Sequence, residues 1–272
     1  MTSTIADLET VKARMKATWM DGDFGEVAKT IEDHAVDFIA RRNITPGMRV
    51  LDVACGTGNL AIPAAKAGAV VTGVDIATNL VEQARERARL AGLSIQFDEG
   101  DAEDLPYPDA SFDLVVSMYG AMFAPRPERA ASELLRVCRP GGTIALASWT
   151  PGGFVGQVFK MIAGYIPPTP GVQSPVLWGD EEIVRERLGD GVSDLEMAKV
   201  KVDIRYPFDP RGAVDFQRTY FGPTIRAFAA LPEDERPAFD DQMVNMFSQN
   251  NRATDGTTDV ESEYLEVVAK RV

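Results

Sequence analysis

Three acidic residues and a glycine-containing turn stand where buried strands of this chain are expected to end. The segment 52–58 (DVACGTG) follows a first strand, Asp75 ends a second, and Gly100-Asp101-Ala102 follows a third. Glycines let a backbone turn sharply and approach a ligand closely. A carboxylate at the end of the second strand can accept hydrogen bonds from both hydroxyls of a ribose. An acidic residue at the third suits the exocyclic amine of adenine, so the pattern predicts a site for an adenosine-containing ligand.

Each part of this pattern also has a plainer interpretation when it is taken alone. A tight strand-to-helix turn needs glycine even without a ligand, and Gly56 to Ala61 also fits the dinucleotide fingerprint G-x-G-x-x-A. Asp75 and Asp101 could each cap the helix that follows. The ordered occurrence of acids at successive strand ends is the feature that favours a ligand site.

The segments that must position these residues alternate between strands and helices. Strands are expected at 49–54, 69–75, 94–100, 112–118 and 143–149, and helices at 58–67, 77–91 and 128–138. Helices are also expected at 3–20, 25–42 and 180–188, with two more within 210–250, a long strand at 195–206 and a closing strand from 260. Strict alternation indicates a parallel sheet with helices on both faces. Ligands of such sheets bind at the carboxyl ends of the strands.

The full series of motifs resembles the class I S-adenosylmethionine-dependent methyltransferases. It comprises LDVACGTG (51–58), GVD (73–75), GDAEDLP (100–106), FDLVVS (112–117) and LRVCRPGG (135–142). The resemblance covers about residues 45–150 well and the flanks weakly.

The resemblance implies a role for each matching residue. The turn of Ala54, Cys55, Gly56 and Gly58 would line the methionine and ribose part of S-adenosylmethionine, with Asp52 fixing the turn or the amino group. Asp75 would hold the ribose hydroxyls, while Ile76 and Leu80 would flank the adenine. Asp101 and Ala102 would read the adenine edge, and Ser117 and Met118 would lie beside the methionine end. Cys55 is given no nucleophilic role.

The resemblance also predicts the fold, an α/β Rossmann-like, mostly parallel seven-stranded sheet flanked by helices. We expect a helical lid in residues 1–42 and the cofactor-binding core in 43–150. Residues 151–272 would add cap insertions, at about 151–179 and 210–256, and the closing strands of the sheet.

The predicted function is transfer of a methyl group to a small-molecule acceptor by in-line displacement. The cofactor carries its own leaving group, so the protein mainly holds the reactants in line. The resemblance therefore identifies no catalytic residue. Candidate acceptor-binding residues are Trp19, His34, Tyr119, Trp149 and Trp178. His34 is also a candidate base, although a hydrogen-bonded structural histidine is the favoured interpretation. Tyr119 could reach the substrate, although core packing or cofactor contact explains it equally well.

Two other functions stay open at this point. One is an S-adenosylmethionine-binding protein without methyl transfer, such as a sensor or a partner subunit. The other is a nicotinamide-dependent oxidoreductase, which is disfavoured because Tyr119 and Tyr165 lack the lysine of a Tyr-x-x-x-Lys motif. The acceptor, its attacking atom and the oligomeric state are not predicted.

Charge and composition narrow the classes of partner. The chain has a formal net charge of -13 and no cluster of Lys and Arg, which argues against nucleic acid and against an anionic membrane surface. One histidine and two cysteines make a His-built metal site and a disulfide framework implausible. The N-terminal residues lack the pattern of a signal peptide, so we expect a cytoplasmic protein.

Overall fold

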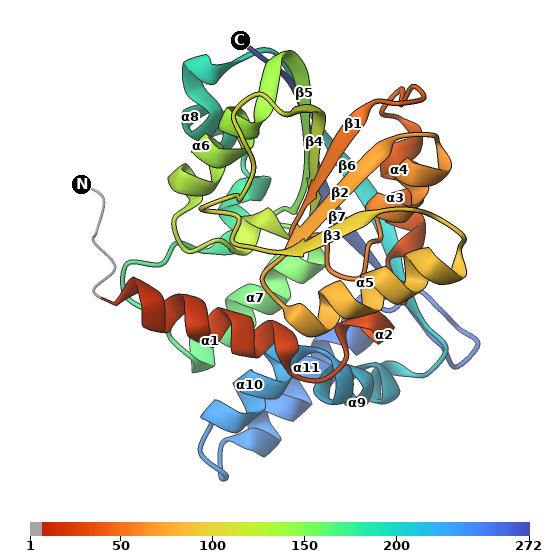
Figure 1. The fold of residues 1–272 in the computed structure, drawn as a ribbon. Helices are drawn as coiled ribbons and strands as arrows, with labels where there is room; N and C mark the ends of the chain where they lie inside the picture. The colour runs from red at the N-terminus through yellow and green to blue at the C-terminus, as the bar shows by residue number, and fades with distance from the viewer. Residues whose placement is uncertain (1–6) are drawn as a thin grey trace.

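A seven-stranded sheet forms the centre of the structure, a computed structural model that describes residues 7–272. The spatial order of the strands is β3-β2-β1-β4-β5-β7-β6 (Figure 1). Their bounds are β1 (Arg49–Val53), β2 (Val70–Asp75), β3 (Gln96–Glu99), β4 (Phe112–Met118), β5 (Cys138–Trp149), β6 (Val192–Tyr206) and β7 (Thr258–Arg271). The order reverses at β1 and β4, and at such a switch point the carboxyl ends of the strands leave a crevice.

The sheet is mixed, so the prediction of a mostly parallel sheet is wrong. The pairings among β1 to β5 are parallel, but β7 runs antiparallel to both β5 and β6. The two antiparallel ladders are also the longest of the sheet; the one between β6 and β7 extends from Val192↔Arg271 to Tyr206↔Thr258. The closing strand β7 lies between β5 and β6, and both of these run in the direction opposite to its own. The alternation of strands and helices in the first 150 residues did not indicate this arrangement.

Helices cover both faces of the parallel part. In Figure 1, α6 (Pro127–Val137) and α8 (Glu181–Leu188) lie on the left of the sheet. On the right lie α3 (Glu32–Ala40), α4 (Ala61–Lys66) and α5 (Thr78–Leu90). The inner face of α5 buries Leu80, Val81, Ala84 and Ala88, the apolar stripe that its sequence spacing predicts.

Several predicted elements differ from the observed ones. The helix expected over 25–42 is divided into α2 (Phe24–Lys29) and α3, because the chain tightens at Thr30, whose N–H donates to the Val27 carbonyl at 3.0 Å. Residues 139–142 were expected to separate the preceding helix from the fifth strand. They lie instead within β5, as a bulge between the pairs Phe112↔Cys138 and Leu114↔Thr143. The part of the helix predicted from Ser3 that precedes Asp7 lies outside the described residues; α1 spans Leu8–Met20.

Residues 151–250 contain more helix than was expected. Residues 151–179 hold α7 (Phe154–Tyr165) and the short helix η2 (Pro175–Gly179), and three helices replace the two expected in 210–250. These are α9 (Pro210–Tyr220), α10 (Gly222–Ala230) and α11 (Arg236–Asn250); the remaining short helices are η1 (Ala121–Phe123) and η3 (Gly189–Gly191).

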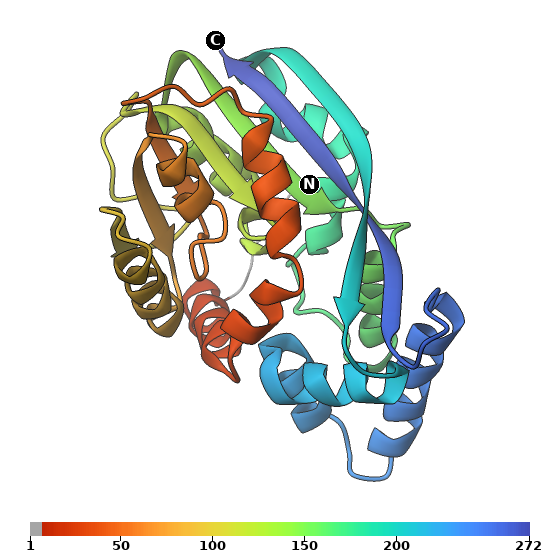
Figure 2. The same cartoon turned by 90° about the vertical axis from the view of Figure 1, so that its right-hand side faces the viewer.

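The end of α1 docks on the junction of α9 and α10. The Asp23 N–H donates to the Tyr220 carbonyl at 3.1 Å, and a Cβ on Gly222 would come within 1.8 Å of the Thr18 carbonyl oxygen. This close approach requires glycine. Figures 1 and 2 show α1, α2 and α9–α11 together at the lower end of the molecule. Within residues 7–272, no helix combines the length and apolarity needed to cross a bilayer.

Candidate active site

A cavity lies at the carboxyl ends of β1, β2 and β4 and beside the residues that follow β3; its empty space, including the open mouth, is about 1040 Å³. We call it the first cavity. Ten of the twelve predicted cofactor residues line it: Asp52, Ala54, Cys55, Gly56, Asp75, Ile76, Leu80, Asp101, Ala102 and Met118. The other two, Gly58 and Ser117, lie behind its wall. Residues 7–31 close the opposite side of the cavity through Lys12, Met15, Trp19, Phe24, Ala28 and Ile31.

The turn after β1 adopts a backbone conformation that glycine favours. Gly56 and Gly58 have φ angles of 52° and 84°, and Ala54 itself has a φ of 55°. Gly58 does not reach the cavity; a Cβ there would come within 3.3 Å of the Phe97 ring. Its role is to let the turn pack against β3, so that Gly56 is presented to the cavity.

Asp75 fixes this turn from the neighbouring strand. Its Oδ2 accepts a hydrogen bond from the Gly56 N–H at 2.8 Å, and its Oδ1 accepts one from the Ala77 N–H at 2.8 Å. Burial raises the pKa of Asp75, and the donated hydrogen bonds oppose that rise. Each carboxylate oxygen has a further lone pair, so Asp75 can hold the turn and still accept hydrogen bonds from a ligand.

Asp52 lies deeper in the cavity wall. Its Oδ2 accepts from the Ala61 N–H at 3.0 Å, at the start of α4. Burial raises the pKa of Asp52 well above its usual value, and the nearby charge of Asp75 raises it further. Burial likewise raises the pKa of Cys55. The thiol therefore stays protonated.

Asp101 is joined to α1 by a lysine that the sequence analysis did not single out. Lys12 Nζ lies 2.5 Å from Asp101 Oδ2 and 2.8 Å from Glu103 Oε2, while Asp101 Oδ1 accepts from the Glu103 N–H at 2.8 Å. Burial alone would lower the pKa of Lys12, but its hydrogen bonds to the two carboxylates raise it. Lys16 pairs with Glu99 one helical turn later. These ion pairs hold α1 against the cavity edge.

Glu103 is the fully buried member of this network, and its removal is expected to destabilise the fold. Its carboxylate also accepts from the Arg126 N–H at 2.5 Å and from Arg126 Nε at 2.8 Å. Because Glu103→Leu leaves these donors without a partner, the free energy of unfolding should fall by about 3 kcal/mol. Urea unfolding measures it. The control is Glu86→Leu, which breaks an exposed pair with Arg89; an equal effect of both variants would contradict the prediction.

The chain after β4 approaches the turn after β1 across the cavity floor. Tyr119 has a φ of 54°, rare for an aromatic residue and a sign of imposed strain. A Cβ on Gly120 would lie 2.6 Å from the Ala54 carbonyl oxygen. Ser117 Oγ donates to the Val53 carbonyl at 2.7 Å and accepts from the Ala121 N–H at 2.9 Å, so it ties both segments together.

Comparison with known proteins agrees with this site. A family model described as a methyltransferase domain matches residues 51–146. The chain is 40% identical over 268 residues to an uncharacterized protein of Mycobacterium tuberculosis, covering 97% of this chain and 96% of that protein. It is also 40% identical over 124 residues to a demethylmenaquinone methyltransferase of Deinococcus radiodurans, 44% of this chain and 52% of that protein.

The fold is also that of solved methyltransferases. The chain superposes with a TM-score of 0.56 on a phosphoethanolamine N-methyltransferase of Haemonchus contortus solved in complex with S-adenosylmethionine. The two are 18% identical, and the match covers 88% of this chain and 52% of that one. Residues 51–146 thus belong to a methyltransferase domain family, and the fold is that of the class I S-adenosylmethionine-dependent methyltransferases. S-adenosylmethionine is the cofactor expected of this methyltransferase fold, and acids at three strand ends of the first cavity fit its ribose, adenine and amino groups.

A second cavity, with about 780 Å³ of empty space including its open mouth, adjoins the first in this methyltransferase. The two share five lining residues, namely Trp19, Phe24, Ile31, Tyr119 and Phe123. Beyond these, the second cavity is lined mainly by apolar and aromatic side chains of α7, α11 and β6, together with Trp149 at the end of β5 and Phe221 between α9 and α10. The helices α9 and α10 themselves contribute Gln217 and Thr224. Among the described residues, no Asp, Glu, Lys, Arg or His lines it.

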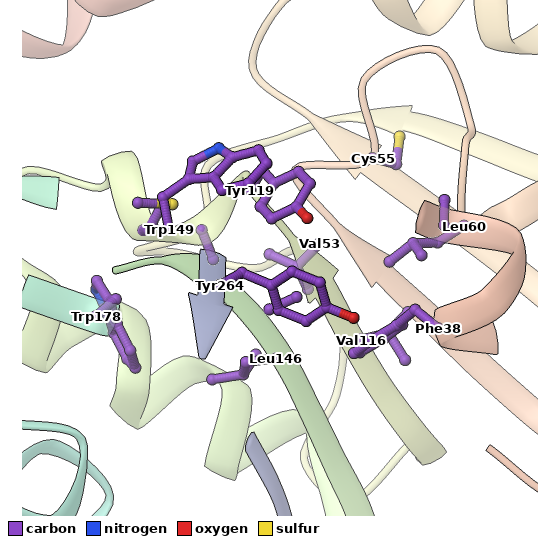
Figure 3. Close-up of a cluster of buried hydrophobic side chains, with 14 of the residues drawn as sticks. Phe38, Val53, Cys55, Leu60, Val116, Tyr119, Leu146, Trp149, Trp178 and Tyr264 are labelled. Atoms are coloured by element: carbon purple, nitrogen blue, oxygen red, sulfur yellow. The ribbon is translucent and has the colours of Figure 1, made fainter. Parts of the chain in front are cut away.

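Trp19, Tyr119 and Trp149 are thus brought together, whereas Trp178 is not. The rings of Tyr119 and Trp149 stack with centroids 3.8 Å apart, and Figure 3 shows Trp178 separate from this pair. Trp178 is 2% exposed, lies under the guanidinium of Arg187, and reaches neither large cavity. The prediction that Trp178 binds the acceptor is therefore abandoned.

His34 does not line either cavity. Its Nε2 lies 3.0 Å from the Asp203 carbonyl, which can only accept, so Nε2 carries the hydrogen. Nδ1 then faces the Tyr119 hydroxyl at 3.4 Å. The side chain of His34 thus connects α3 to β6 from behind Tyr119, which is a structural role.

The buried state of His34 predicts a pH dependence of stability. Burial lowers its pKa below the ordinary 6.5, and the hydrogen bond that His34 donates to the Asp203 carbonyl opposes this shift. As the pH falls below 6.5, the unfolded chain binds a proton that the folded chain resists, so the free energy of unfolding should fall. His34→Gln should remove this contribution. Urea unfolding between about pH 7.5 and about pH 5.5 gives the slope of the free energy of unfolding against pH for the wild type and for His34→Gln. Equal slopes for the two proteins would contradict the prediction.

Proposed function

We propose that this methyltransferase transfers a methyl group from S-adenosylmethionine in the first cavity to a small-molecule acceptor in the second. The observation that carries the proposal is the shared wall: ligands in both cavities would meet between Trp19, Phe24 and Phe123. S-adenosylmethionine supplies an activated methyl group and its own leaving group. The protein would act by holding the two molecules in line and excluding water.

Different residues of the first cavity would bind the ribose, the adenine and the methionine part of the cofactor. Asp75 would accept from the ribose hydroxyls, beside the turn that it already fixes. Asp101 and Ala102 would read the adenine edge, with Ile76 and Leu80 at the faces of the ring. Ala54, Gly56 and Met118 would line the methionine part, with Asp52 toward its amino group.

Residues 7–42 and the helices within 151–179 and 210–256 would serve as the cap over these ligands. α1 contributes Lys12, Met15 and Trp19 to the first cavity. α7 and α9–α11 contribute most of the second cavity's outer wall.

The test is acceptor-dependent formation of S-adenosylhomocysteine. The purified chain with S-adenosylmethionine and a panel of neutral aromatic and aliphatic compounds should release S-adenosylhomocysteine above the rate without an acceptor. Release should stop in a variant that cannot bind the cofactor. If S-adenosylmethionine and panel compounds bind together but none supports release, the interpretation as a sensor or partner subunit replaces this one.

A further inference from the structure

We propose that the acceptor is an uncharged, mainly apolar molecule that attacks through the lone pair of an aromatic nitrogen or a thioether sulfur, without losing a proton. The proposal rests on the proposed function and concerns the chemistry of the second cavity. It follows from what lines that cavity and from what does not.

The wall of the second cavity carries no formal charge. Its aromatic members come from six separate segments of the chain and include Phe154, Phe159, Tyr206, Phe221 and Phe247. A charged acceptor would lose its hydration on entering this cavity and would find no oppositely charged side chain there, which costs free energy. Carboxylates, phosphates and protonated amines are therefore poor ligands for it.

Four polar side chains of this wall, Thr30, Gln217, Tyr206 and Tyr119, form hydrogen bonds within the protein. Thr30 Oγ1 donates to the Val27 carbonyl at 2.8 Å. Gln217 Nε2 donates to the Tyr206 hydroxyl at 2.7 Å. Tyr119 offers its hydroxyl hydrogen to His34 Nδ1, and in Figure 3 this hydroxyl points away from Trp149. These hydrogen bonds orient the wall, and the polar groups that remain on it are neutral.

No group on the acceptor side is suited to take a proton. Asp52, Asp75 and Asp101 line only the first cavity. Burial raises the pKa of Tyr119 well above its usual value, so its phenol is not a base near neutral pH. An alcohol or phenol would have to give up its proton to a general base during methyl transfer. The cavity offers none among the described residues.

A lone pair on nitrogen or sulfur needs no such base. The acceptor's lone pair forms the new bond to the methyl carbon, the carbon–sulfur bond breaks, and its electron pair goes to sulfur. No proton leaves, and the positive charge moves from the sulfonium to the acceptor. The faces of aromatic rings attract cations. Trp19, Phe24, Tyr119 and Phe123, which the two cavities share, can thus stabilise that charge on both sides of the transfer.

The test uses three bicyclic probes of one shape: isoquinoline, 2-naphthol and 2-naphthoate. Binding in the presence of S-adenosylhomocysteine is followed by quenching of tryptophan fluorescence, since Trp19 and Trp149 line the cavity. The two neutral probes should bind with similar Kd, and the anion at least about tenfold more weakly. With S-adenosylmethionine, mass spectrometry should find N-methylisoquinolinium and no methyl ether of 2-naphthol above the uncatalysed level.

A pair of variants locates the probes. Val158 on α7 is half-buried and lines the second cavity. Val158→Asp should tighten N-methylisoquinolinium by at least about threefold and weaken 2-naphthoate further, relative to the isosteric Val158→Asn. Circular dichroism confirms that both variants are folded. Equal behaviour of the two would show that the probes bind elsewhere and would overturn the proposal.

The remaining outcomes are also decisive. Methylation of 2-naphthol at a rate equal to that of isoquinoline, or equal binding of 2-naphthoate, would overturn the proposal. Isoquinoline that binds beside S-adenosylmethionine but is not methylated would overturn it as well. Failure of S-adenosylmethionine to bind at all would instead contradict the proposed function, and the binding pattern of the probes would still test the cavity.

Discussion

Replacing Asp75 by alanine is expected to lower the affinity for S-adenosylmethionine by about 100-fold. A hydrogen bond to a charged group contributes roughly 1.5–3 kcal/mol, and tenfold in Kd corresponds to about 1.4 kcal/mol. Loss of both ribose contacts would already produce the change. The variant also frees the Gly56 N–H, which Asp75 holds at 2.8 Å. Isothermal calorimetry measures the affinity directly.

Two variants separate a specific effect from general damage. Asp75→Asn keeps the shape and one acceptor oxygen, so its affinity should lie between the wild type and Asp75→Ala. Asp104→Ala removes a carboxylate that is 85% exposed and does not line the first cavity. It should bind like the wild type. If Asp75→Ala binds as well as Asp104→Ala, the assignment of Asp75 to the ribose is wrong.

Adding a single methyl group at Gly120 is expected to disrupt the same site from the other side. The Cβ of Gly120→Ala would lie 2.6 Å from the Ala54 carbonyl oxygen and 2.7 Å from the Ala54 Cβ. The turn after β1 and the chain after β4 must then separate. We expect the free energy of unfolding to fall by about 2 kcal/mol and the affinity for S-adenosylmethionine to fall at least about tenfold.

The matched control is Gly152→Ala. Gly152 is exposed, its φ is not positive, and an added Cβ would meet nothing within 4 Å. This variant should match the wild type in both urea unfolding and calorimetry. Because neither glycine has a positive φ, the comparison isolates steric contact from backbone strain. If Gly120→Ala binds S-adenosylmethionine as tightly as the wild type, the two segments can move apart without loss of affinity.

The parallel part of the fold and most of the first cavity could be predicted from sequence because both depend on local order. Strand ends in a parallel sheet meet at one edge, so acids at 52, 75 and 101 had to come together once the strands were recognised. Ten of the twelve predicted cofactor residues line the cavity for this reason. Gly58 and Ser117 were placed in the right segments, but they act behind the wall.

The rest depends on contacts between distant segments, which no local pattern records. Lys12 gains its role only because α1 crosses the residues that follow β3. The antiparallel β7 follows helices whose sequence carries no mark of strand direction. Trp178 looked like a member of an aromatic pocket, yet aromatic residues fill cores as readily as binding sites, and packing placed it under Arg187.

Binding of S-adenosylmethionine in the first cavity is tested most directly by isothermal calorimetry of the purified chain with S-adenosylmethionine, S-adenosylhomocysteine and NADH. Both adenosyl ligands are expected to bind with a Kd on the order of 10 μM or tighter at one site per chain, whereas NADH should give no binding heat. Binding of NADH but of neither adenosyl ligand would contradict the assignment of the first cavity to S-adenosylmethionine, and the turn at 52–58 would then be a dinucleotide site.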